Sequence, residues 1–267
     1  MLGLGLSIAE VSSFGSAVAG NSWPYGDYDD INGLGDEANV QFMVMFDQHI
    51  GQEGNSVPDE TGDHTITIGA NATITSDGLV MGSPDAEGAT VPDSPDWRIV
   101  TGDHFGVLEV LFTREAALST DAELVQIYSG TGNNRSVWLR MNTSHEIRAL
   151  LSENGTLTDK DFTSSPTTVP LNTLYYAALM HDGGKTPTSN NRFRIYLGEA
   201  GVTNGVTEAV NVINTFAPYD AAISMRIGIN SDVRIKGVRF RRIETGFPTS
   251  VPGVSDPFTA PLGFGKG

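Results

Sequence analysis

The chain has 267 residues, with 32 acidic and 16 basic side chains and no cysteine, so disulfides, thiolate metal sites and a cysteine nucleophile are excluded. No Lys or Arg precedes Arg98, and the 16 acidic residues of segment 1–97 account for the whole net charge of −16. This acidity argues against nucleic acid and anionic membranes as partners, although solubility in salty surroundings is a simpler explanation of the charge. The chain contains no run of about 18 apolar residues, so the sequence predicts no transmembrane helix.

The two ends of the chain differ in composition from its centre. Residues 1–39 are rich in Gly, Ser and Asp, and residues 245–267 contain four prolines, so both segments are predicted to be extended arms. Extended apolar segments bury much surface on a partner, and both arms are therefore predicted to contact neighbouring molecules, the N-terminal one through Leu2, Leu4, Leu6 and Ile8. Apolar residues alternate with small ones at Leu2, Leu4, Leu6 and Ile8, which indicates a short strand. Residues 8–14 could instead form one or two helical turns.

Between the arms, short apolar runs separated by turn residues indicate one β domain over residues 40–244. Most of these runs have the two-residue period of a strand, and no segment of any length has the period of a helix. The sequence therefore predicts an all-β fold, a two-sheet antiparallel sandwich. The predicted strands are 40–46, 64–68, 72–75, 79–81, 105–113, 122–129, 135–141, 145–151, 174–180, 192–197, 223–229 and 232–243.

The clearest hairpin joins residues 174–180 to residues 192–197. The first of these strands is apolar on both phases, which predicts a position deep in the sheet, whereas the second alternates cleanly. The letters LYYAA, then DGG, then the strand RIYLG resemble the laminin-G-like branch of the concanavalin A-like jelly rolls. These proteins usually carry W-x-x-V-A where this chain has LYYAA.

A second stretch carries the same resemblance at the expected distance upstream. It reads TITIGANATITSDGLVMGSPDAEGATVPDSPDW, and its VPDSP follows a G-x-x-x-x-G pattern. The resemblance implies a concanavalin A-like jelly-roll sandwich over residues 40–244. It does not imply one activity, because this fold hosts lectins, glycosidases, adhesion modules and inert structural domains.

The last predicted strand, 232–243, changes phase at Gly237, which is typical of a β-bulge. The change keeps all of its basic side chains on the face opposite the apolar ones. We therefore predict an assembly face that could meet the acidic N-terminal part of a neighbouring molecule, made of Arg234, Lys236, Arg239 and Arg241.

Signatures of catalysis are absent from the sequence. It contains no E-x-D-x-x-E glycosidase motif, G-x-S-x-G elbow, phosphate loop or G-x-G-x-x-G, and its five histidines lack zinc spacing. The protein is therefore predicted not to be an enzyme. A degenerate glycosidase would need a carboxylate pair that only folding brings together, and the nearest same-face pairs are Asp27/Asp29, Asp85/Glu87, Asp121/Glu123 and Asp159/Asp161.

No cofactor is required by the sequence, but calcium is a candidate. The acidic loop at residues 27–33 comes close to an EF-hand loop, yet positions one and twelve would be Tyr28 and Asn39, so the bidentate ligand is missing. An acidic turn without metal is the simpler interpretation. The candidate metal ligands are Asp27, Asp29, Asp30 and Asp182.

The predicted hairpin at 135–151 gives the most specific surface hypothesis. With a three-residue turn, Trp138 would face Arg148 and Arg140 would face Glu146 on the side opposite the apolar residues. A Trp flanked by forked donors can stack on a sugar ring and bind its hydroxyls. A cross-strand cation–π pair or a subunit contact is the alternative. The candidate glycan-binding residues are Trp138, Arg140, Glu146 and Arg148.

Together these features predict a non-enzymatic structural protein of a virion, in the class of capsid-decoration, neck or tail-fibre components. The Leu-Gly-Leu-Gly-Leu opening resembles the first residues of many tailed-phage virion proteins. The expected partners are other virion proteins or further copies of the chain, with a carbohydrate as a possible ligand. The alternative is a secreted or surface-displayed carbohydrate-binding module.

Overall fold

The computed structural model describes residues 40–81, 87–98, 105–129, 132, 134–156, 158, 160–182, 191–200, 206–214, 216–229 and 232–243. The predicted arms, 1–39 and 245–267, lie outside the described residues, as do Leu2, Leu4, Leu6, Ile8, Asp27, Asp29 and Asp30. Within the described part of the chain, no helix is long and apolar enough to cross a bilayer.

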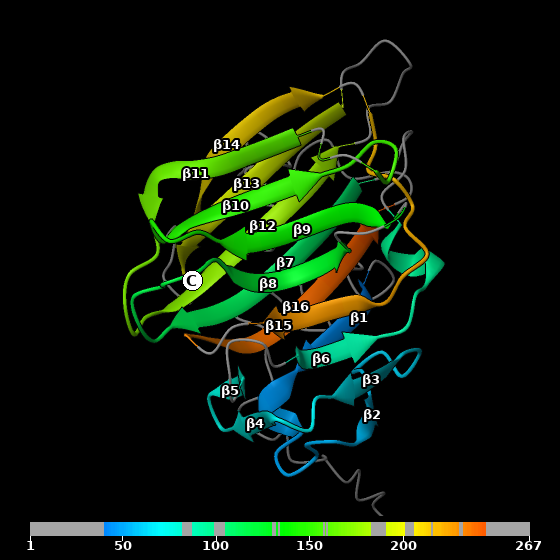
Figure 1. Cartoon of the computed structure of the whole chain (residues 1–267), viewed down its shortest axis with the longest axis vertical. Helices are drawn as coiled ribbons and strands as arrows, with labels where there is room; N and C mark the ends of the chain where they lie inside the picture. The colour runs from blue at the N-terminus through cyan, green and yellow to red at the C-terminus, as the bar shows by residue number, and fades with distance from the viewer. Residues whose placement is uncertain are drawn as a thin grey trace, which may run out of the picture.

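The described residues form strands and two short 3-10 helices (Figure 1). The 3-10 helices are η2 (Phe46–Gln48) and η3 (Pro95–Trp97). The strands are β1 (Val40–Met45), β2 (Ser56–Pro58), β3 (Thr65–Ile68), β4 (Ala72–Thr75), β5 (Gly78–Met81), β6 (Glu87–Val91), β7 (Phe105–Arg114), β8 (Ala122–Tyr128), β9 (Arg135–Met141), β10 (Glu146–Leu151), β11 (Lys160–Thr168), β12 (Leu174–Asp182), β13 (Asn191–Glu199), β14 (Val206–Asn214), β15 (Met225–Ile229) and β16 (Val233–Ile243).

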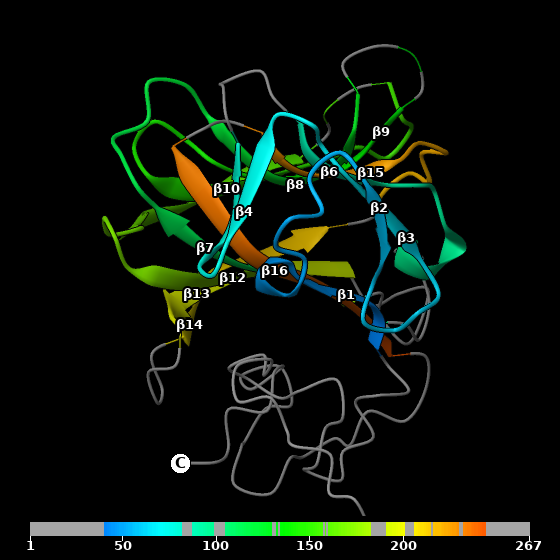
Figure 2. The ribbon, with the colours of Figure 1, turned by 90° about the horizontal axis from the view of Figure 1, so that it is seen from below.

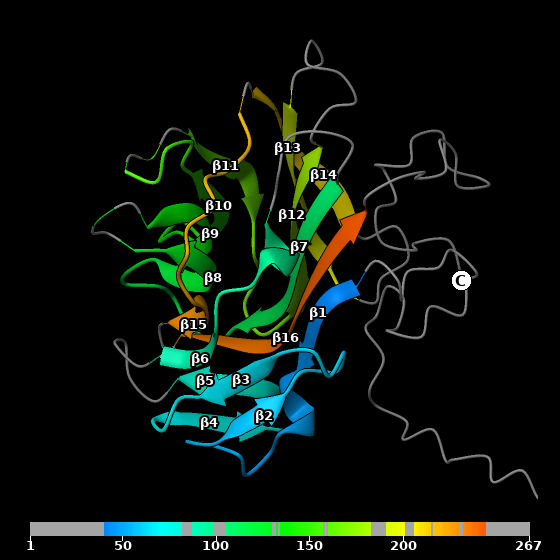
Figure 3. The same ribbon diagram turned by 90° about the vertical axis from the view of Figure 1, so that its right-hand side faces the viewer.

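The strands form two stacked sheets, seen from two sides in Figures 2 and 3. Sheet A has the order β14-β13-β12-β7-β16-β5-β4, with β1 also beside β16, and sheet B has the order β11-β10-β9-β8-β15-β6-β3-β2. All pairs between these named strands are antiparallel. The predicted two-sheet antiparallel, jelly-roll-like sandwich is confirmed.

The core lies between the sheets and contains every second side chain of the long strands, as the two-residue period requires. Phe112 and Phe240 from sheet A, and Leu139 and Ile147 from sheet B, are among its buried residues. β12 lies between β13 and β7, which confirms the deep position predicted from its apolar sequence.

The strands that the sequence did not predict include edge strands of the sheets. β11 falls in the stretch 152–173, which was predicted to be a polar loop, and β14 and β2 were also missed. An edge strand has a neighbour on one side only and tolerates polar residues and Pro, so its apolar period is weak. β6 was missed as well, although it lies inside sheet B.

The predicted bulge in β16 is confirmed. Its pairing with β7 shifts register between Ile235 and Gly237, and Val238 and Phe240 face the core on the far side of the shift. On its other edge, β16 pairs with β5 near Ile235 and with β1 from Gly237 onward. One strand thus joins three others in sheet A.

The outer edge of β1 is bound by two carboxylates rather than by another strand. The Met43 amide donates to Asp59 Oδ2 (3.3 Å), the Met45 amide donates to Glu60 Oε1 (2.7 Å), and the Glu60 amide donates to the Met43 carbonyl (2.9 Å). Burial raises the pKa of Glu60 to about 7, although the Met45 amide opposes this. The side chains of the β2–β3 turn thereby satisfy donors that an edge strand would otherwise expose.

His181 is a titratable group inside the core. It is fully buried, its ring lies 4.6 Å from that of Phe193, and neither ring nitrogen has a hydrogen-bond partner. Burial lowers the pKa of His181 from 6.5 to about 3. Between these two pH values the unfolded chain binds a proton that the folded chain does not, so folding stability falls as the pH falls.

We expect His181→Phe to remove this contribution to acid sensitivity. From pH 6.5 down toward 3, His181 should cost the wild type up to about 1.4 kcal/mol of unfolding free energy per pH unit. Urea unfolding at several pH values from 4 to 7.5 measures the slope for both proteins. Parallel slopes would show that His181 gains a proton in the folded state as readily as in the unfolded one.

Candidate functional site

The outward-facing side of sheet B carries a cluster of aromatic and charged side chains from four neighbouring strands and the residue that precedes β8. We call it the outer cluster. It consists of Asp121, Glu123, Gln126, Tyr128, Trp138, Arg140, Arg148 and Asp161.

Two cross-strand rows build the outer cluster. In one row Gln126, Trp138 and Leu150 are paired across β8, β9 and β10. In the next row Glu123 pairs with Arg140, and Arg140 pairs with Arg148. Residues in one row lie about 5 Å apart on the same face, so their side chains act on a common surface.

The predicted pairing within the β9–β10 hairpin is wrong by two residues. Met141 pairs with Ile147 rather than with His145, so Trp138 faces Leu150 and Arg140 faces Arg148. The turn is longer than predicted because Asn142 organises it. The Oδ1 atom of Asn142 accepts hydrogen bonds from the amides of Ser144 (2.9 Å) and Glu146 (3.0 Å).

A shift of two residues does not move a side chain to the other face of a sheet. Trp138, Arg140 and Arg148 therefore share the outer face, as the sequence predicted. Glu146, the fourth predicted residue, is engaged in the turn, where its Oε2 accepts a hydrogen bond from Asn142 Nδ2 (3.0 Å). It does not pair with Arg140.

The aromatic part of the outer cluster is Trp138 with Tyr128. Their ring centroids lie 4.9 Å apart at an interplanar angle of 33°. The Arg140 guanidinium lies over the Trp138 ring, 4.3 Å from its centroid. The alternative of a cation–π contact at Trp138 is thus present, but within strand β9 rather than across the hairpin. Trp138 is half-buried, and its Nε1 has no hydrogen-bond partner.

The charged part of the outer cluster alternates in sign. Arg140 Nη1 lies 3.0 Å from Asp121 Oδ2, and Arg148 Nη1 lies 3.8 Å from the same oxygen. Arg148 also binds both oxygens of Asp161, with Nε donating to Oδ1 at 2.6 Å and Nη2 donating to Oδ2. Hydrogen bonding by Arg148 lowers the pKa of Asp161 despite some burial. These ion pairs fix both guanidinium planes on the surface.

Glu123 is the titratable group of the outer cluster. Burial raises its pKa to about 7, and the nearby Asp121 also raises it, while Arg140 opposes the change. Its Oε2 atom is buried and has no hydrogen-bond partner. Near neutral pH, Glu123 therefore exists both in a protonated form, which can donate a hydrogen bond, and in an ionised form, which can only accept one. The carboxylate pair Asp121/Glu123 was noted in the sequence, but its place beside Trp138 and Arg140 follows only from the sheet order.

The four basic residues predicted as an assembly face do share the outer side of sheet A, but each has an acidic partner in its own chain. Arg234 pairs with Asp77 (3.0 Å) and with Glu115, and Lys236 pairs with Asp47 (3.2 Å). A role of these residues in assembly stays a prediction.

Arg239 and Arg241 form a buried network with Glu109 of β7. Arg239 donates to both oxygens of Glu109 (2.7 and 2.9 Å), and Arg241 Nε donates to Oε2 (3.0 Å). The Tyr176 hydroxyl donates to Oε1 (3.0 Å). Burial would raise the pKa of Glu109, but the two guanidinium groups and these hydrogen bonds outweigh it and keep the pKa below its usual value.

The candidate metal residues receive no structural support here. Asp182 ends β12 opposite Arg192 and Phe105, and its side chain lies outside the described residues. Across the described ranges, no group of three or more His, Asp or Glu side chains is placed to hold a metal ion.

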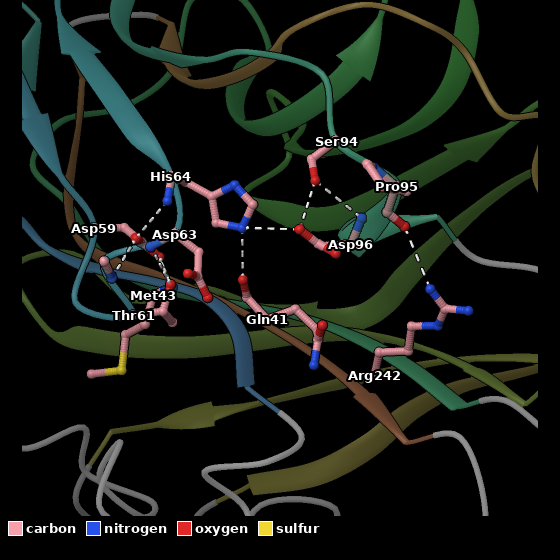
Figure 4. A network of polar contacts seen from close by, with 11 residues as sticks. Gln41, Met43, Asp59, Thr61, Asp63, His64, Ser94, Pro95, Asp96 and Arg242 are labelled. Carbon is pink, nitrogen blue, oxygen red and sulfur yellow. Dashed lines mark hydrogen bonds and ion pairs between the residues drawn. The ribbon is translucent and has the colours of Figure 1, made fainter.

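A second polar network, shown in Figure 4, contains Ser94, Asp96 and His64. The Ser94 hydroxyl donates to Asp96 Oδ2 (2.7 Å) rather than to His64, and Ser94 also caps η3 by accepting from the Asp96 amide (3.2 Å). His64 Nε2 contacts Asp96 (3.3 Å) and the Gln41 carbonyl (2.9 Å). A nucleophilic serine needs a base at its hydroxyl, so this network is structural and joins β1, η3 and the residue that precedes β3.

The architecture defines a two-sheet antiparallel β-sandwich with an aromatic and charged surface on one sheet. Family models and curated protein sequences give no match to this chain. Among solved structures, a Trypanosoma rangeli sialidase in complex with 2-keto-3-deoxy-D-glycero-D-galacto-2,3-difluoro-nononic acid is similar with a TM-score of 0.52 at 12% identity, over 76% of this chain and 30% of the sialidase.

A structure of botulinum neurotoxin type C is similar with a TM-score of 0.50 at 8% identity, over 77% of this chain and 48% of that chain. This chain thus spans less than half of the length of either structure. At such low identities the likeness shows the fold alone, which is the β-sandwich that this chain shares with part of each.

We expect Glu109→Gln to destabilise the protein strongly, because it leaves two guanidinium groups buried with one carboxylate fewer. The loss should be about 3–5 kcal/mol of unfolding free energy. Glu115→Gln is the matched control, since Glu115 pairs with the partly exposed Arg234 and should cost within about 1 kcal/mol. Denaturant unfolding of both variants measures the difference, and equal losses would show that burial of the network does not govern its energy.

Proposed function

We propose that this protein is a non-enzymatic carbohydrate-binding domain and that the outer cluster of sheet B is its binding surface. The observation that carries the proposal is the half-buried Trp138 beside Tyr128, surrounded by two guanidinium groups and three carboxyl groups on one sheet face. An aromatic ring covers the apolar side of a sugar, while charged side chains bind its hydroxyls.

The polar groups of the outer cluster are already oriented for such a ligand. Asp121 and Asp161 hold Arg148, and Asp121 holds Arg140. Pre-organised groups lose little conformational freedom when a ligand binds. Three buried polar atoms of the outer cluster have no hydrogen-bond partner, namely Nε1 of Trp138, Oε2 of Glu123 and Nε of Arg140.

The comparisons lend support of a general kind. Cell entry of the similar botulinum neurotoxin type C depends on interaction with two ganglioside molecules, and the similar sialidase is in complex with a sugar derivative. A sandwich of this kind is therefore compatible with carbohydrate recognition, while the residues that would perform it here are those of the outer cluster.

The raised pKa of Glu123 favours a second candidate, a degenerate glycosidase. A carboxyl group with a pKa near 7 suits a general acid, and the ionised partner would be Asp121. Both guanidinium groups bind Asp121, however, and this engages the carboxylate that a hydrolytic mechanism would need. We therefore keep the non-enzymatic proposal.

We expect Trp138→Ala to abolish binding on a glycan array and to change the melting temperature little, because Trp138 lies outside the core cluster. Thr65→Ala is the matched control, since Thr65 is exposed on the outer face of the same sheet, in β3. The bound glycans are also incubated with the wild-type protein. Unchanged binding by Trp138→Ala would refute the site, and release of sugar would refute the non-enzymatic assignment.

We further propose that the protein is a structural component of a virion, with the sandwich facing outward. The support comes from the sequence, in the apolar, charge-poor N-terminus and its resemblance to tailed-phage virion proteins. We expect mass spectrometry of purified particles to find the chain in a fixed ratio to the capsid proteins. Its presence only in the surrounding medium would instead favour a secreted carbohydrate-binding module.

A further inference from the structure

The aromatic ring at the centre of the outer cluster is covered by its neighbours. The Arg140 guanidinium lies over the Trp138 ring, 4.3 Å from its centroid, and the Tyr128 ring lies 4.9 Å away at an interplanar angle of 33°. A cation over an aromatic face occupies the place where the apolar side of a sugar would stack. A sugar can therefore reach this face of Trp138 only if the guanidinium moves aside.

Of the two neighbours, Tyr128 is anchored at its far end. It is buried, and its hydroxyl lies 2.8 Å from Thr158 Oγ1. Arg140 is held by Asp121 through its Nη1 atom (3.0 Å), while its Nε atom has no hydrogen-bond partner. Arg140 is thus the neighbour of Trp138 that has an unused donor and can gain from a change of position.

A second position for the Arg140 guanidinium is available at Glu123. The two residues are directly opposite each other in the pairing of β8 with β9. The Oε2 atom of Glu123, like the Nε atom of Arg140, is buried without a hydrogen-bond partner. Residues opposite each other in a sheet are close enough for their side chains to interact. A turn of the guanidinium about its contact with Asp121 would satisfy both atoms and would uncover Trp138.

We propose that Arg140 is the gate residue of the carbohydrate site, which it closes by lying on Trp138 and opens by turning to Glu123. The gate rests on the proposed function, because it regulates the same outer cluster. The arrangement described above is then the closed form. Asp121 binds Arg140 at Nη1, so the same ion pair can be kept in both positions.

The charge of Glu123 decides between the two positions. Burial raises the pKa of Glu123 to about 7, with a further increase from Asp121 and an opposing effect of Arg140. Protonated Glu123 attracts the guanidinium weakly, whereas ionised Glu123 gains a charged hydrogen bond when the guanidinium turns to it. Opening therefore lowers the pKa of Glu123. By linkage, the open form is increasingly favoured as the pH rises to about 7, and the effect levels off above that pH.

The other charged groups near Glu123 do not titrate near neutral pH in a way that could replace it. On β15, the second neighbour of β8, Ile229 lies opposite Glu123. Further charged residues on the same face lie in another row or farther along the sheet, namely Arg226 of β15, Arg148 of β10 and Asp161 of β11. Arginine stays protonated at neutral pH, and hydrogen bonding by Arg148 lowers the pKa of Asp161.

Arg140→Ala in the full-length chain tests the gate. The probes are the glycans that the wild type retains on an array at pH 8, and isothermal titration measures their Kd at pH 5.5 and pH 8. We expect Arg140→Ala to bind about threefold to tenfold more tightly than the wild type at pH 5.5, because the ring face no longer has to be uncovered. Weaker or equal binding would overturn the gate.

The matched control for this variant is Arg148→Ala. Arg148 also contacts Asp121 but is bound to Asp161 on its other side, so its loss uncovers no ring face and should not tighten binding. Equal tightening by both variants would show that lost positive charge, rather than an uncovered ring, is the cause, and would also overturn the gate.

Glu123→Gln tests the second position of the guanidinium. We expect the wild-type affinity to rise by about threefold or more from pH 5.5 to pH 8, and the affinity of Glu123→Gln to stay flat. In the Arg140→Ala background, Glu123→Gln should have no further effect, because the two residues act on each other. The same pH dependence in the wild type and in Glu123→Gln would overturn the role of Glu123.

NMR of the protein without glycan separates failure of the gate from failure of the proposed function. Protons of Arg140 that lie over the Trp138 ring are shifted upfield by its ring current, and we expect this shift to decrease as the pH rises through 7 in the wild type but not in Glu123→Gln. A shift that is constant in both proteins would refute the gate, even if glycans bind. A pH-dependent shift in a wild type that retains no glycan would refute the carbohydrate site instead.

Discussion

The register shift between Ile235 and Gly237 is the constraint on which both faces of sheet A depend. β16 lies beside β7, β5 and β1, so its phase determines which side chains three neighbours meet. With an unbroken two-residue period, the side chains beyond the shift would exchange faces, and Arg239 would enter the core in place of Val238. The bulge instead places Arg239 directly opposite Glu109.

The two outer faces of the sandwich carry similar residue types but differ in how deeply these residues are buried. On the outer face of sheet B, the guanidinium groups of Arg140 and Arg148 are partly exposed and are held by the carboxylates of Asp121 and Asp161. On the outer face of sheet A, the same residue types are fully buried around Glu109 and surrounded by apolar side chains. The same residue types thus differ between the two faces in their burial.

Much of the sandwich follows from the sequence, because alternation determines which side chains face the core. The strand with Phe193, Ile195 and Leu197 and the bulge at Gly237 were both predicted in this way. The hairpin register was not, because the hydrogen bonds of Asn142 lengthen its turn. Edge strands such as β11 were missed because water satisfies one of their sides and their sequence needs no apolar period.

The candidate site was predictable only in part, for a related reason. Trp138, Arg140 and Arg148 come from one hairpin, so local pairing is enough to place them on one face. Asp161 and Glu123 come from strands that neighbour the hairpin in the sheet, and their approach depends on a strand order that local sequence does not encode. The unpartnered Oε2 atom and raised pKa of Glu123 are consequences of that order.

The carboxylates that bind the free edge of β1 have a consequence for how the molecule can associate. Since Asp59 and Glu60 already accept the hydrogen bonds of Met43 and Met45, another chain cannot extend sheet A by adding a strand there. A continuous sheet therefore cannot extend from one molecule to another at the β1 edge of sheet A. Copies that meet along β1 must do so through side-chain contacts, which are more readily reversed than a shared ladder of backbone hydrogen bonds.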